Sequence, residues 1–514
     1  MPPEPHRGRT LAACIVASAL VFLDGSVVNV ALPAIRDDLG GGLAAQQWVV
    51  EGFLLALAAF LLLGGSLGDL LGHRRILRIG TLAFGVTSLL CALAPTVELL
   101  VAARIVQGLA GAILVPVSLA LITDTFAEDE RGAAIGTWTA WTSVAMIAGP
   151  FVGGLLVDQL DWRLIFGINV PLVAVTMWLA RSIAADAERP KARVDVTGAV
   201  LVSLGLAGVI FALVEQPAHG WGAGRVALPG AGGLALLAAF LGWEARTAAP
   251  MLPLGLFRER NFSVINATTL FLYAPLGASS FLLSVFLQQV AGYEATTAGL
   301  ALLPTTLVVI ALARRFGGLA DRIGAHRFVA AGSFIVAIAF ALLMRVDERG
   351  DYFSQVFPAM LVLGLGLSLA VAPLTAKVLS SAPPERAGTA SGINNAASRV
   401  AGLLAIAALG GLAATTFADR IDTLRAESPA AAQAEIAASR ERPFQVFSDA
   451  PTAAERQAVE AAQTSASVRA FHVTMGVGAA LALLGSLIAA VGLTDRRHPA
   501  HAALAPTGGD GAAA

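Results

Sequence analysis

Among the polar residues inside the long apolar segments of this 514-residue chain, four could carry charge or proton chemistry: Asp24, Arg104, Gln107 and Arg399. A charge at the centre of a membrane helix is unfavourable by roughly 2.5–3.5 kcal/mol on insertion scales, so it needs a partner or a task. Burial favours the neutral form of a carboxyl group, whereas a nearby arginine favours the ionised form. A carboxyl group balanced in this way can bind and release a proton as its surroundings change. We therefore expect proton-transfer chemistry at Asp24.

Helical spacing predicts that the first three of these residues meet. If the apolar segments 11–33 and 98–123 cross a membrane in opposite directions, Asp24 and Arg104 differ in depth by only about 5 Å. Gln107 lies one turn after Arg104 on the same face and can orient the guanidinium. The prediction is an ion pair, direct or through water, in which Asp24 binds the proton. A static structural ion pair is the alternative.

Arg399 has no equally deep acidic residue near it in the second half of the chain. It either faces a cavity and attracts an anionic group, or it caps helix carbonyls. Glu51 lies near one end of its apolar segment and is expected at the membrane interface. Further candidates for an apolar substrate cavity are Asn29, Phe271, Tyr273 and Phe281. For the aromatic residues, simple packing within the protein is the alternative.

The composition places these residues in a membrane protein. Hydrophobic residues make up 56% of the chain and charged residues 13%, against about 25% charged in a soluble domain, which excludes a soluble enzyme. The 34 basic and 35 acidic residues leave no basic field for nucleic acid. Cys14 and Cys91 lie in apolar runs and predict neither a disulfide nor a metal site. Neither Lys191 nor Lys377 follows a phosphate-binding glycine loop, so we expect no ATP site and no cofactor.

Fourteen apolar segments are long enough to cross a bilayer, which takes about 20 helical residues. They lie near 11–33, 48–68, 77–95, 98–123, 132–157, 163–181, 195–214, 227–244, 262–287, 297–315, 327–344, 354–379, 389–415 and 472–493. Arg and Lys are concentrated in alternate short loops, which predicts that both termini are cytoplasmic. High Ala, Gly and Arg with little Lys suggests a GC-rich bacterial source, so we expect the cell membrane of a bacterium.

The chain repeats itself at an offset of 252 residues. The pattern of residues 65–75 returns with Asp321 and Gly324 in the places of Asp69 and Gly72. Two related halves with a site between them near mid-membrane are typical of carriers that work by alternating access. The predicted fold is all-α and integral to the membrane, with 14 transmembrane helices in two pseudo-symmetric six-helix bundles plus an inserted helix pair. The expected units are a cytoplasmic tail (1–10), an N-terminal bundle (11–181), the inserted pair (195–244), a C-terminal bundle (262–493) with an extracellular loop (417–471), and a disordered cytoplasmic tail (494–514). The loop is rich in Ala, Glu, Arg and Gln, so we expect it to hold helices outside the bilayer.

Four stretches of the chain resemble the fourteen-span drug:proton antiporter family of the major facilitator superfamily. The resemblance covers nearly the whole chain. Residues 23–33 are similar to the family's first span, with Ser26 in place of threonine, and residues 104–108 to its Arg-x-x-Gln-Gly signature. The loop signature between the second and third spans is carried by Gly65, Asp69, Gly72, Arg74 and Arg75, with His73 in place of the first basic residue. The antiporter signature of the fifth span is carried by Gly136, Gly149, Pro150, Gly153 and Gly154, with Ala145 at one glycine position.

The resemblance implies proton-coupled efflux of hydrophobic or amphipathic small molecules by alternating access, without catalysis. It implies that Asp24, Arg104 and Gln107 couple the proton, and that the two glycine-rich signatures and their second copy, Asp321 and Gly324, take part in conformational change. The implied partners are a small-molecule substrate, protons and the lipid bilayer, and we expect a monomer. An importer or uniporter of a metabolite is the alternative within the class. A multispanning membrane enzyme is a remote one, because residues 417–471 hold no histidine or cysteine.

Overall fold

The computed structural model describes residues 7–183, 195–248, 250–383 and 386–494. It describes no side chains at 62–66, 69, 128–129, 132, 321 and 387–388. The described residues form helices joined by turns, without strands among them. Fourteen helical segments are long and apolar enough to cross a membrane, as the sequence predicts. Residues 1–6 of the predicted tail 1–10, and all but Thr494 of the predicted tail 494–514, lie outside the described residues.

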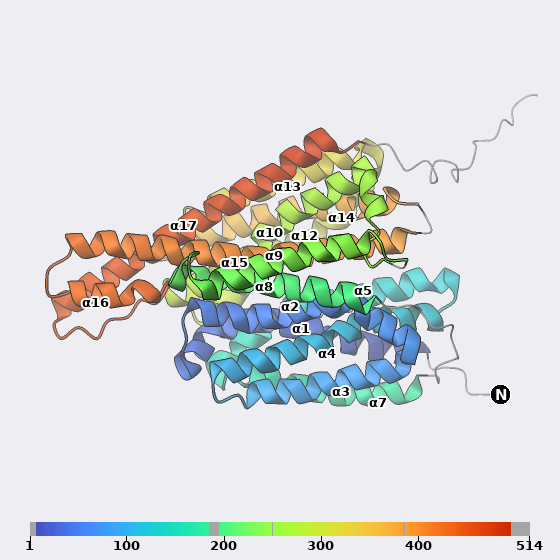
Figure 1. Ribbon diagram of the computed structural model, residues 1–514, viewed down its shortest axis with the longest axis horizontal. Coiled ribbons are helices and arrows are strands. Elements are labelled where there is room, and N and C mark those ends of the chain that lie inside the picture. The colour runs from blue at the N-terminus through green and yellow to red at the C-terminus, as the bar shows by residue number, and fades with distance from the viewer. Residues whose placement is uncertain (1–6, 184–194, 249, 384–385, 495–514) are drawn as a thin grey trace, which may run out of the picture.

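Six spans form the first bundle, drawn in blue to cyan in Figure 1. They are α1 (Arg7–Leu39), α2 (Leu43–Leu71), α3 (His73–Ala92), α4 (Val97–Thr125), α5 (Glu128–Gln159), and the consecutive helices α6 (Leu164–Gly167) and α7 (Asn169–Leu179), which make one span. Thr96 fixes the start of α4, because its side chain accepts a hydrogen bond from the Leu99 N–H. Helix α1 packs against α4, α5 and α7, whereas α2 and α3 both pack against α4.

The second bundle repeats this packing. It comprises α10 (Arg260–Gln289), α11 (Ala295–Ala301) with α12 (Leu303–Ile323), α13 (Ala325–Leu343), α14 (Phe357–Ser380), α15 (Ala387–Glu427) and α17 (Ala453–Gly492). Helix α10 packs against α15 and α17 as α1 packs against α5 and α7, and α12 and α13 pack against α14 as α2 and α3 pack against α4. The two bundles are therefore pseudo-symmetric.

The repeat is visible in the backbone as well. Gly72 joins α2 to α3 with φ +94°, and Gly324 joins α12 to α13 with φ +114°. Residues with a side chain rarely adopt such φ values, so both copies of the turn require glycine. The equivalence of Gly72 and Gly324 that the sequence suggests is thus an equivalence of conformation.

The inserted pair consists of α8 (Val196–His219) and α9 (Gly224–Glu244), which pack against each other. Helix α8 also lies against α2 of the first bundle and α15 of the second. The pair therefore covers one side of the junction between the bundles. The structure places these helices within the range 195–244 that the sequence assigns to the insertion.

Helices α15 and α17 continue well beyond the bundle and carry α16 (Gln433–Ala438) between them (Figure 1). The predicted loop 417–471 is therefore largely helix: α15 runs on to Glu427, and α17 begins at Ala453 rather than near 472. Its Ala, Glu, Arg and Gln residues favour helix in water as well. We call the end of the molecule that carries α16 the hairpin end, and the opposite end, where α1 begins, the terminal end.

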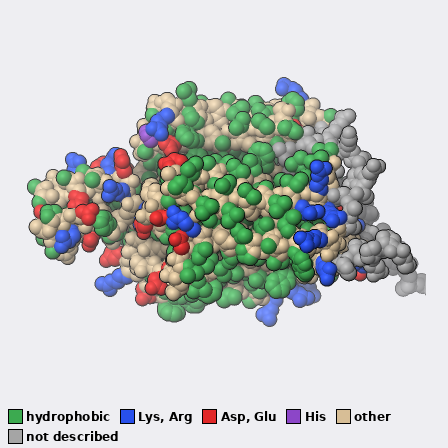
Figure 2. Space-filling view, turned by 90° about the horizontal axis from the view of Figure 1, so that it is seen from below, with side chains coloured by type: hydrophobic (Ala, Val, Ile, Leu, Met, Phe, Trp, Pro, Cys, Tyr) green, Lys and Arg blue, Asp and Glu red, His purple; other side chains and the backbone are tan. Residues whose placement is uncertain are grey.

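Side chains on the surface follow this layout. Figure 2 shows a broad band of hydrophobic side chains across the middle of the molecule, with charged side chains gathered at the two ends and on the hairpin. Such a band fits the apolar interior of a bilayer, whose hydrocarbon core is about 30 Å thick.

The two glycine turns generate a stability prediction. Replacing Gly72 or Gly324 by Ala should lower the free energy of unfolding by roughly 1–2 kcal/mol each, because alanine disfavours positive φ. Denaturant unfolding of the purified protein in detergent measures this change. The control is Gly392→Ala within α15, where an added Cβ meets no atom within 4 Å and helix propensity favours alanine. Equal stability of Gly72→Ala and Gly392→Ala would contradict the prediction.

Candidate functional site

The charged centre of the first bundle is a buried ion pair between α1 and α4. Arg104 Nη1 binds Asp24 Oδ2, and the two side chains are 1% and 0% exposed. Arg104 Nη1 also donates to Gln107 Oε1 (2.7 Å), and Arg104 Nε donates to the Val49 carbonyl of α2 (3.0 Å). The structure thus brings together the three residues whose meeting the sequence predicts.

The other Asp24 oxygen is also occupied. Asp24 Oδ1 accepts hydrogen bonds from Gln107 Nε2 (2.9 Å) and from Asn169 Nδ2 of α7 (2.9 Å). Both donors also bond to Ser88 Oγ of α3, at 2.9 and 3.1 Å. One cation and two further donors thus occupy both oxygens of this buried carboxyl group. Protonation of Asp24 would remove the ionic part of this network.

Two partners in this network were not predicted as site residues from the sequence. Asn169 stands near the start of α7, in a stretch that resembles the family more weakly than the four described above. Ser88 lies in an apolar run, and no motif around it marks a functional residue. Phe53 and Phe166 complete the enclosure, with the Arg104 guanidinium carbon 4.2 and 5.6 Å from their ring centres. Only the tertiary packing shows that these side chains converge: α2, α4, α6 and α7 pack against α1, and α3 packs against α4 and α7.

A central cavity of about 490 Å³ lies between the two bundles. Helices α1, α2 and α5 line it from one bundle, and α10, α11, α12, α14 and α15 from the other. Its wall is mainly apolar, with side chains such as Phe22, Leu57, Met146 and Leu363. Asn29 and Arg399 both line it, and Arg399 is the one charged side chain among its described lining residues. A cavity of this size and character suits an amphipathic organic molecule.

The aromatic side chains expected in this wall lie elsewhere. Phe271, Tyr273 and Phe281 are not among the residues that line the cavity; α10 turns Leu276, Ser279, Ser280 and Leu283 toward it instead. Phe281 is buried in an apolar cluster to which helices of both bundles contribute. Phe271 packs beside Gly485 of α17. The prediction of an aromatic wall is corrected to simple packing.

Glycines of the antiporter signature let α5 lie close to α1. A Cβ added to Gly149 would overlap Ser26, and one added to Gly153 would overlap Val27. Both neighbours are on α1, close in sequence to Asp24. Small residues at this four-residue spacing allow two helices in a membrane to approach closely. A shift of α5 is therefore transmitted directly to the helix that carries the buried acid.

The same signature also contacts the other bundle. A Cβ on Gly154 would overlap the backbone of Thr296 in α11, and Gly299 of α11 packs against the Pro150 carbonyl. Helix α5 is thus in close contact with α1 on one side and with α11 on the other. At Gly136 an added Cβ would meet no atom within 4 Å, so packing gives no reason for that glycine.

Several hydrogen bonds join the bundles between the cavity and the hairpin end. They are Gln47 Nε2 to the Ile406 carbonyl (2.7 Å), Ser284 Oγ to the Asn29 carbonyl (3.0 Å), Gln289 Nε2 to Gln46 Oε1 (3.5 Å), and the backbone N–H groups of Ala295 and Thr296 to the Asp158 carboxylate (3.1 and 2.8 Å). We call this set the hairpin-end seal. It must break if the cavity is to open toward that end.

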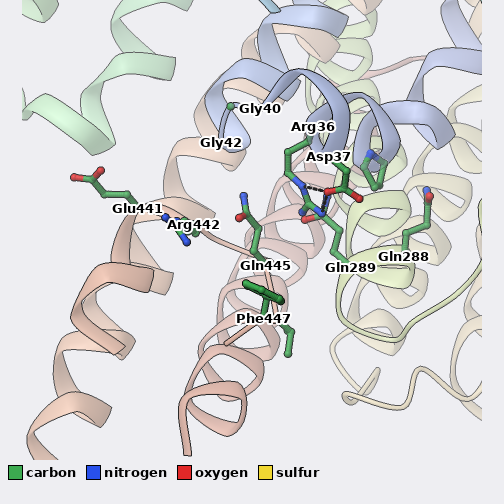
Figure 3. Close-up of a pocket in the computed structure, with 13 residues that line it drawn as sticks. Arg36, Asp37, Gly40, Gly42, Gln288, Gln289, Glu441, Arg442, Gln445 and Phe447 are labelled. Carbon is green, nitrogen blue, oxygen red and sulfur yellow. Dashed lines mark hydrogen bonds and ion pairs between the residues drawn. The ribbon is translucent and has the colours of Figure 1, made fainter. Parts of the chain in front are cut away.

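A polar pocket of about 740 Å³ lies above the seal, where residues 441–447 approach the loop between α1 and α2 (Figure 3). Arg36 and Asp37 form an ion pair on its wall, and Arg442, Gln288 and Gln289 project around it. The pocket is larger than the central cavity but polar and open. We therefore regard it as an open polar mouth above the junction of the bundles rather than as a substrate site.

The loop signature at the terminal end is described in part. Gly72 makes the turn into α3, and His73 Nδ1 lies 2.9 Å from Asp124 Oδ2 at the end of α4. Arg74 and Arg75 are both engaged in interactions. Side-chain positions at Asp69 and Asp321, and the surroundings of Gly65, lie outside what the structure describes. Among the described residues no group of three or more His, Cys, Asp or Glu could hold a metal ion.

The fold and the cavity define a helical membrane carrier built from two repeated bundles. A search with family profiles identifies the Major Facilitator Superfamily over residues 14–406, and the chain belongs to that family. Among solved structures, the chain resembles a bacterial homologue of the human lysosomal transporter Spinster in an inward-facing, occupied conformation. The TM-score is 0.67 at 15% identity, over 96% of this chain and 99% of the other. This likeness concerns the fold.

Characterised relatives are more similar in sequence. The multidrug resistance protein Stp of Mycobacterium tuberculosis is 34% identical over 79% of this chain and 75% of its own length. The tetracenomycin C resistance and export protein of Streptomyces glaucescens is 34% identical, over 81% of this chain and 78% of its own. The cephamycin export protein of Amycolatopsis lactamdurans is 36% identical, over 78% and 83%.

The buried ion pair generates a second stability prediction. Arg104→Gln leaves Asp24 buried without its cation and should destabilise the protein by roughly 3–5 kcal/mol. The double variant Asp24→Asn with Arg104→Gln should recover part of this loss, since no charge remains. Denaturant unfolding in detergent measures both. Arg440→Gln, which removes an exposed ion pair with Asp422, is the control and should change stability by less than about 1 kcal/mol. The prediction fails if Arg104→Gln behaves like the control.

Proposed function

We propose that the protein exports hydrophobic or amphipathic small molecules, such as drugs, antibiotics or secondary metabolites, in exchange for protons. The observation that carries the proposal is the apolar cavity between two bundles, beside a fully buried Asp24–Arg104 pair in one of them. The relatives support the direction of transport, because their names describe resistance and export. An importer or uniporter of a metabolite could use the same cavity, but it would not move its substrate in the export direction that the names of these relatives describe.

Asp24 is the proton-binding group in this proposal. Ionised, it holds α1 against α4 and α7 through Arg104, Gln107 and Asn169. Neutral, it loses the ionic attraction, so α1 can shift relative to α4. Residues Gly25, Ser26 and Asn29 of the same helix line the cavity, so that shift changes the cavity wall. Substrate and proton therefore act on one helix from opposite faces.

The energetics are sufficient for export. One elementary charge moved across 100 mV supplies about 2.3 kcal/mol. A tenfold gradient of a neutral solute requires about 1.4 kcal/mol. One proton entering per cycle can therefore sustain a solute gradient of roughly one to two decades, before any pH gradient is added.

Orientation and environment complete the proposal. We place the terminal end in the cytoplasm and the hairpin end outside, because basic residues such as Arg78, Arg258 and Arg260 lie at the terminal end. The membrane is the cell membrane of a bacterium, and the working unit is a monomer that needs no ATP and no cofactor. We assign no catalytic residues. A membrane enzyme would need a cluster of acids or metal ligands at the interface.

The central test is export from living cells. Expression in a drug-susceptible bacterium should lower the accumulation of one or more compounds in a panel of amphipathic drugs, and collapse of the proton gradient should abolish the effect. Asp24→Asn should abolish it as well, with the protein still present in the membrane. Asp422→Asn, an exposed acid of the hairpin, is the control and should export normally. Higher accumulation in expressing cells would favour the importer, and full export by Asp24→Asn would refute the assigned proton site.

Arg399 predicts a preference for acidic substrates. No hydrogen bond or ion pair joins it to another described residue, so an anionic group of a substrate is its natural partner. Purified protein should bind dansylglycine, a carboxylate, about tenfold more tightly than the neutral dansylglycinamide, a difference of about 1.4 kcal/mol. Arg399→Gln should remove this preference and Arg399→Lys should retain most of it. Equal affinities for the two probes, measured by dansyl fluorescence, would count against a substrate-facing Arg399.

A further inference from the structure

Glu51 of α2 is a buried acid that the mechanism above does not use. Its side chain is 0% exposed, and neither carboxyl oxygen has a hydrogen-bond partner. The side chain therefore faces into the protein, whatever the depth of Glu51 relative to the membrane interface at which the sequence places it. Asp24, by contrast, is equally buried but has three donors. Two acids at similar burial thus have opposite electrostatic surroundings.

The stretch of α2 around Glu51 packs among apolar side chains at the junction of three helices. Trp48 and Leu55 of α2 lie in one cluster with Ile210 of α8 and with Leu403 and Ala407 of α15. Gln47, one turn before Glu51 on the same face, donates to the Ile406 carbonyl of α15. Leu54, one turn after it, lines the central cavity. Glu51 therefore lies within the hairpin-end seal, just beyond the end of the cavity.

The charged groups on the neighbouring helices do not compensate the negative charge that an ionised Glu51 would carry. On α4, Arg104 is engaged by Asp24, and Asp24 itself is the acid of α1. On α8, Glu215 pairs with Arg225. On α15, Arg399 lies on the same face as Ile406 but about two turns nearer the terminal end, where it lines the cavity. On α3, the basic residues His73, Arg74, Arg75 and Arg78 are at the terminal end.

A carboxylate without a partner in a dry interior is highly unfavourable, and such a group takes up a proton instead. We propose that Glu51 is a second proton-binding site of this carrier, neutral while the hairpin-end seal is closed and ionised once the seal opens to water. The inference rests on the proposed export function for its role in transport. Its protonation state and its link to the seal can be tested without transport.

The linkage has a definite sign. Closing the seal buries Glu51, and only the neutral form is tolerated there, so closure binds a proton and low pH favours the closed state. Opening the seal wets the carboxyl group, so Glu51 exchanges its proton with the hairpin end, and high pH at that end favours the open state. Because Glu51 takes its proton from the hairpin end and returns it there, it makes opening of the seal depend on the pH at that end, while Asp24 carries the proton across the membrane. With Asp24, this gives the carrier two titrating acids, one inside the first bundle and one between the bundles.

The first experiment detects the proton on Glu51. Infrared spectra of the full-length protein at neutral pH should contain a protonated carboxyl band that Glu51→Gln removes. Glu215→Gln, which alters a partly exposed acid paired with Arg225, should leave that band unchanged. An identical band in the wild type and in Glu51→Gln would overturn the proposal, because Glu51 would then be ionised in its buried position.

The second experiment measures the link to the seal. Spin labels at Leu93→Cys and Phe353→Cys, which are 75% and 77% exposed at the hairpin end of the two bundles, report the separation of the bundles once Cys14 and Cys91 are replaced by Ala. Measurements are made in an Asp24→Asn background, so that this acid does not contribute. Raising the pH should lengthen the interspin distance, adding Glu51→Gln should abolish the pH response, and Glu51→Asp should retain it. A response that survives Glu51→Gln would overturn the proposal.

Transport then separates the two hypotheses. If the infrared and spin-label results hold but no compound is exported, the export function fails while Glu51 remains a proton site linked to conformation. If export is proton-driven and Glu51→Gln responds to the pH at the hairpin end as the wild type does, Glu51 does not act in transport and the function stands. A weaker dependence of export on the pH at the hairpin end in Glu51→Gln, relative to Glu215→Gln, is the expected result.

Discussion

An ionised side chain cannot remain in a dry membrane interior unless something compensates its charge. Three charged centres of this protein meet that constraint in different ways. Asp24 and Arg104 compensate each other, with further hydrogen bonds from Gln107 and Asn169. Arg399 borders the central cavity, and Glu51 is completely enclosed without a partner. The positions of these groups determine which helices can move apart. They also determine whether a proton or an anionic group must bind or leave when the helices separate.

The packing of the bundles directs such movement to a few contacts. Glycines bring α5 against α1 on one side and α11 on the other, so the junction of the bundles and the helix of Asp24 are mechanically close. On the opposite side, α2, α8 and α15 meet in an apolar cluster beside Glu51. Because the inserted pair contacts both bundles through α8, it can follow their relative motion without entering the cavity.

The number of spans, the repeat and the central ion pair could all be predicted from the sequence. Gly72 and Gly324 could be matched because their turns need a special backbone, and Asp24 and Arg104 because depth follows from counting along opposed helices. The direction of a side chain around its helix could not be predicted. In a membrane both the lipid-facing and the core-facing sides of a helix are apolar, so periodicity does not distinguish them. Phe281 was therefore expected in the cavity wall although it packs in the core, and the inward direction of the Glu51 side chain was not predicted.

Helix α15 has a mechanical consequence. It runs without interruption from Ala387, past Arg399 at the cavity, to Glu427 on the hairpin. Its 41 residues extend about 60 Å, twice the thickness of the hydrocarbon core. Phe444 packs edge-on against Phe286 of α10, which itself stacks on Phe471 of α17, so the segment after α16 is held against the same bundle. The hairpin is thus a rigid extension of the second bundle. An antibody fragment that binds the hairpin would contact the second bundle from the aqueous phase. It could stop the transport cycle without reaching the lipid-covered core.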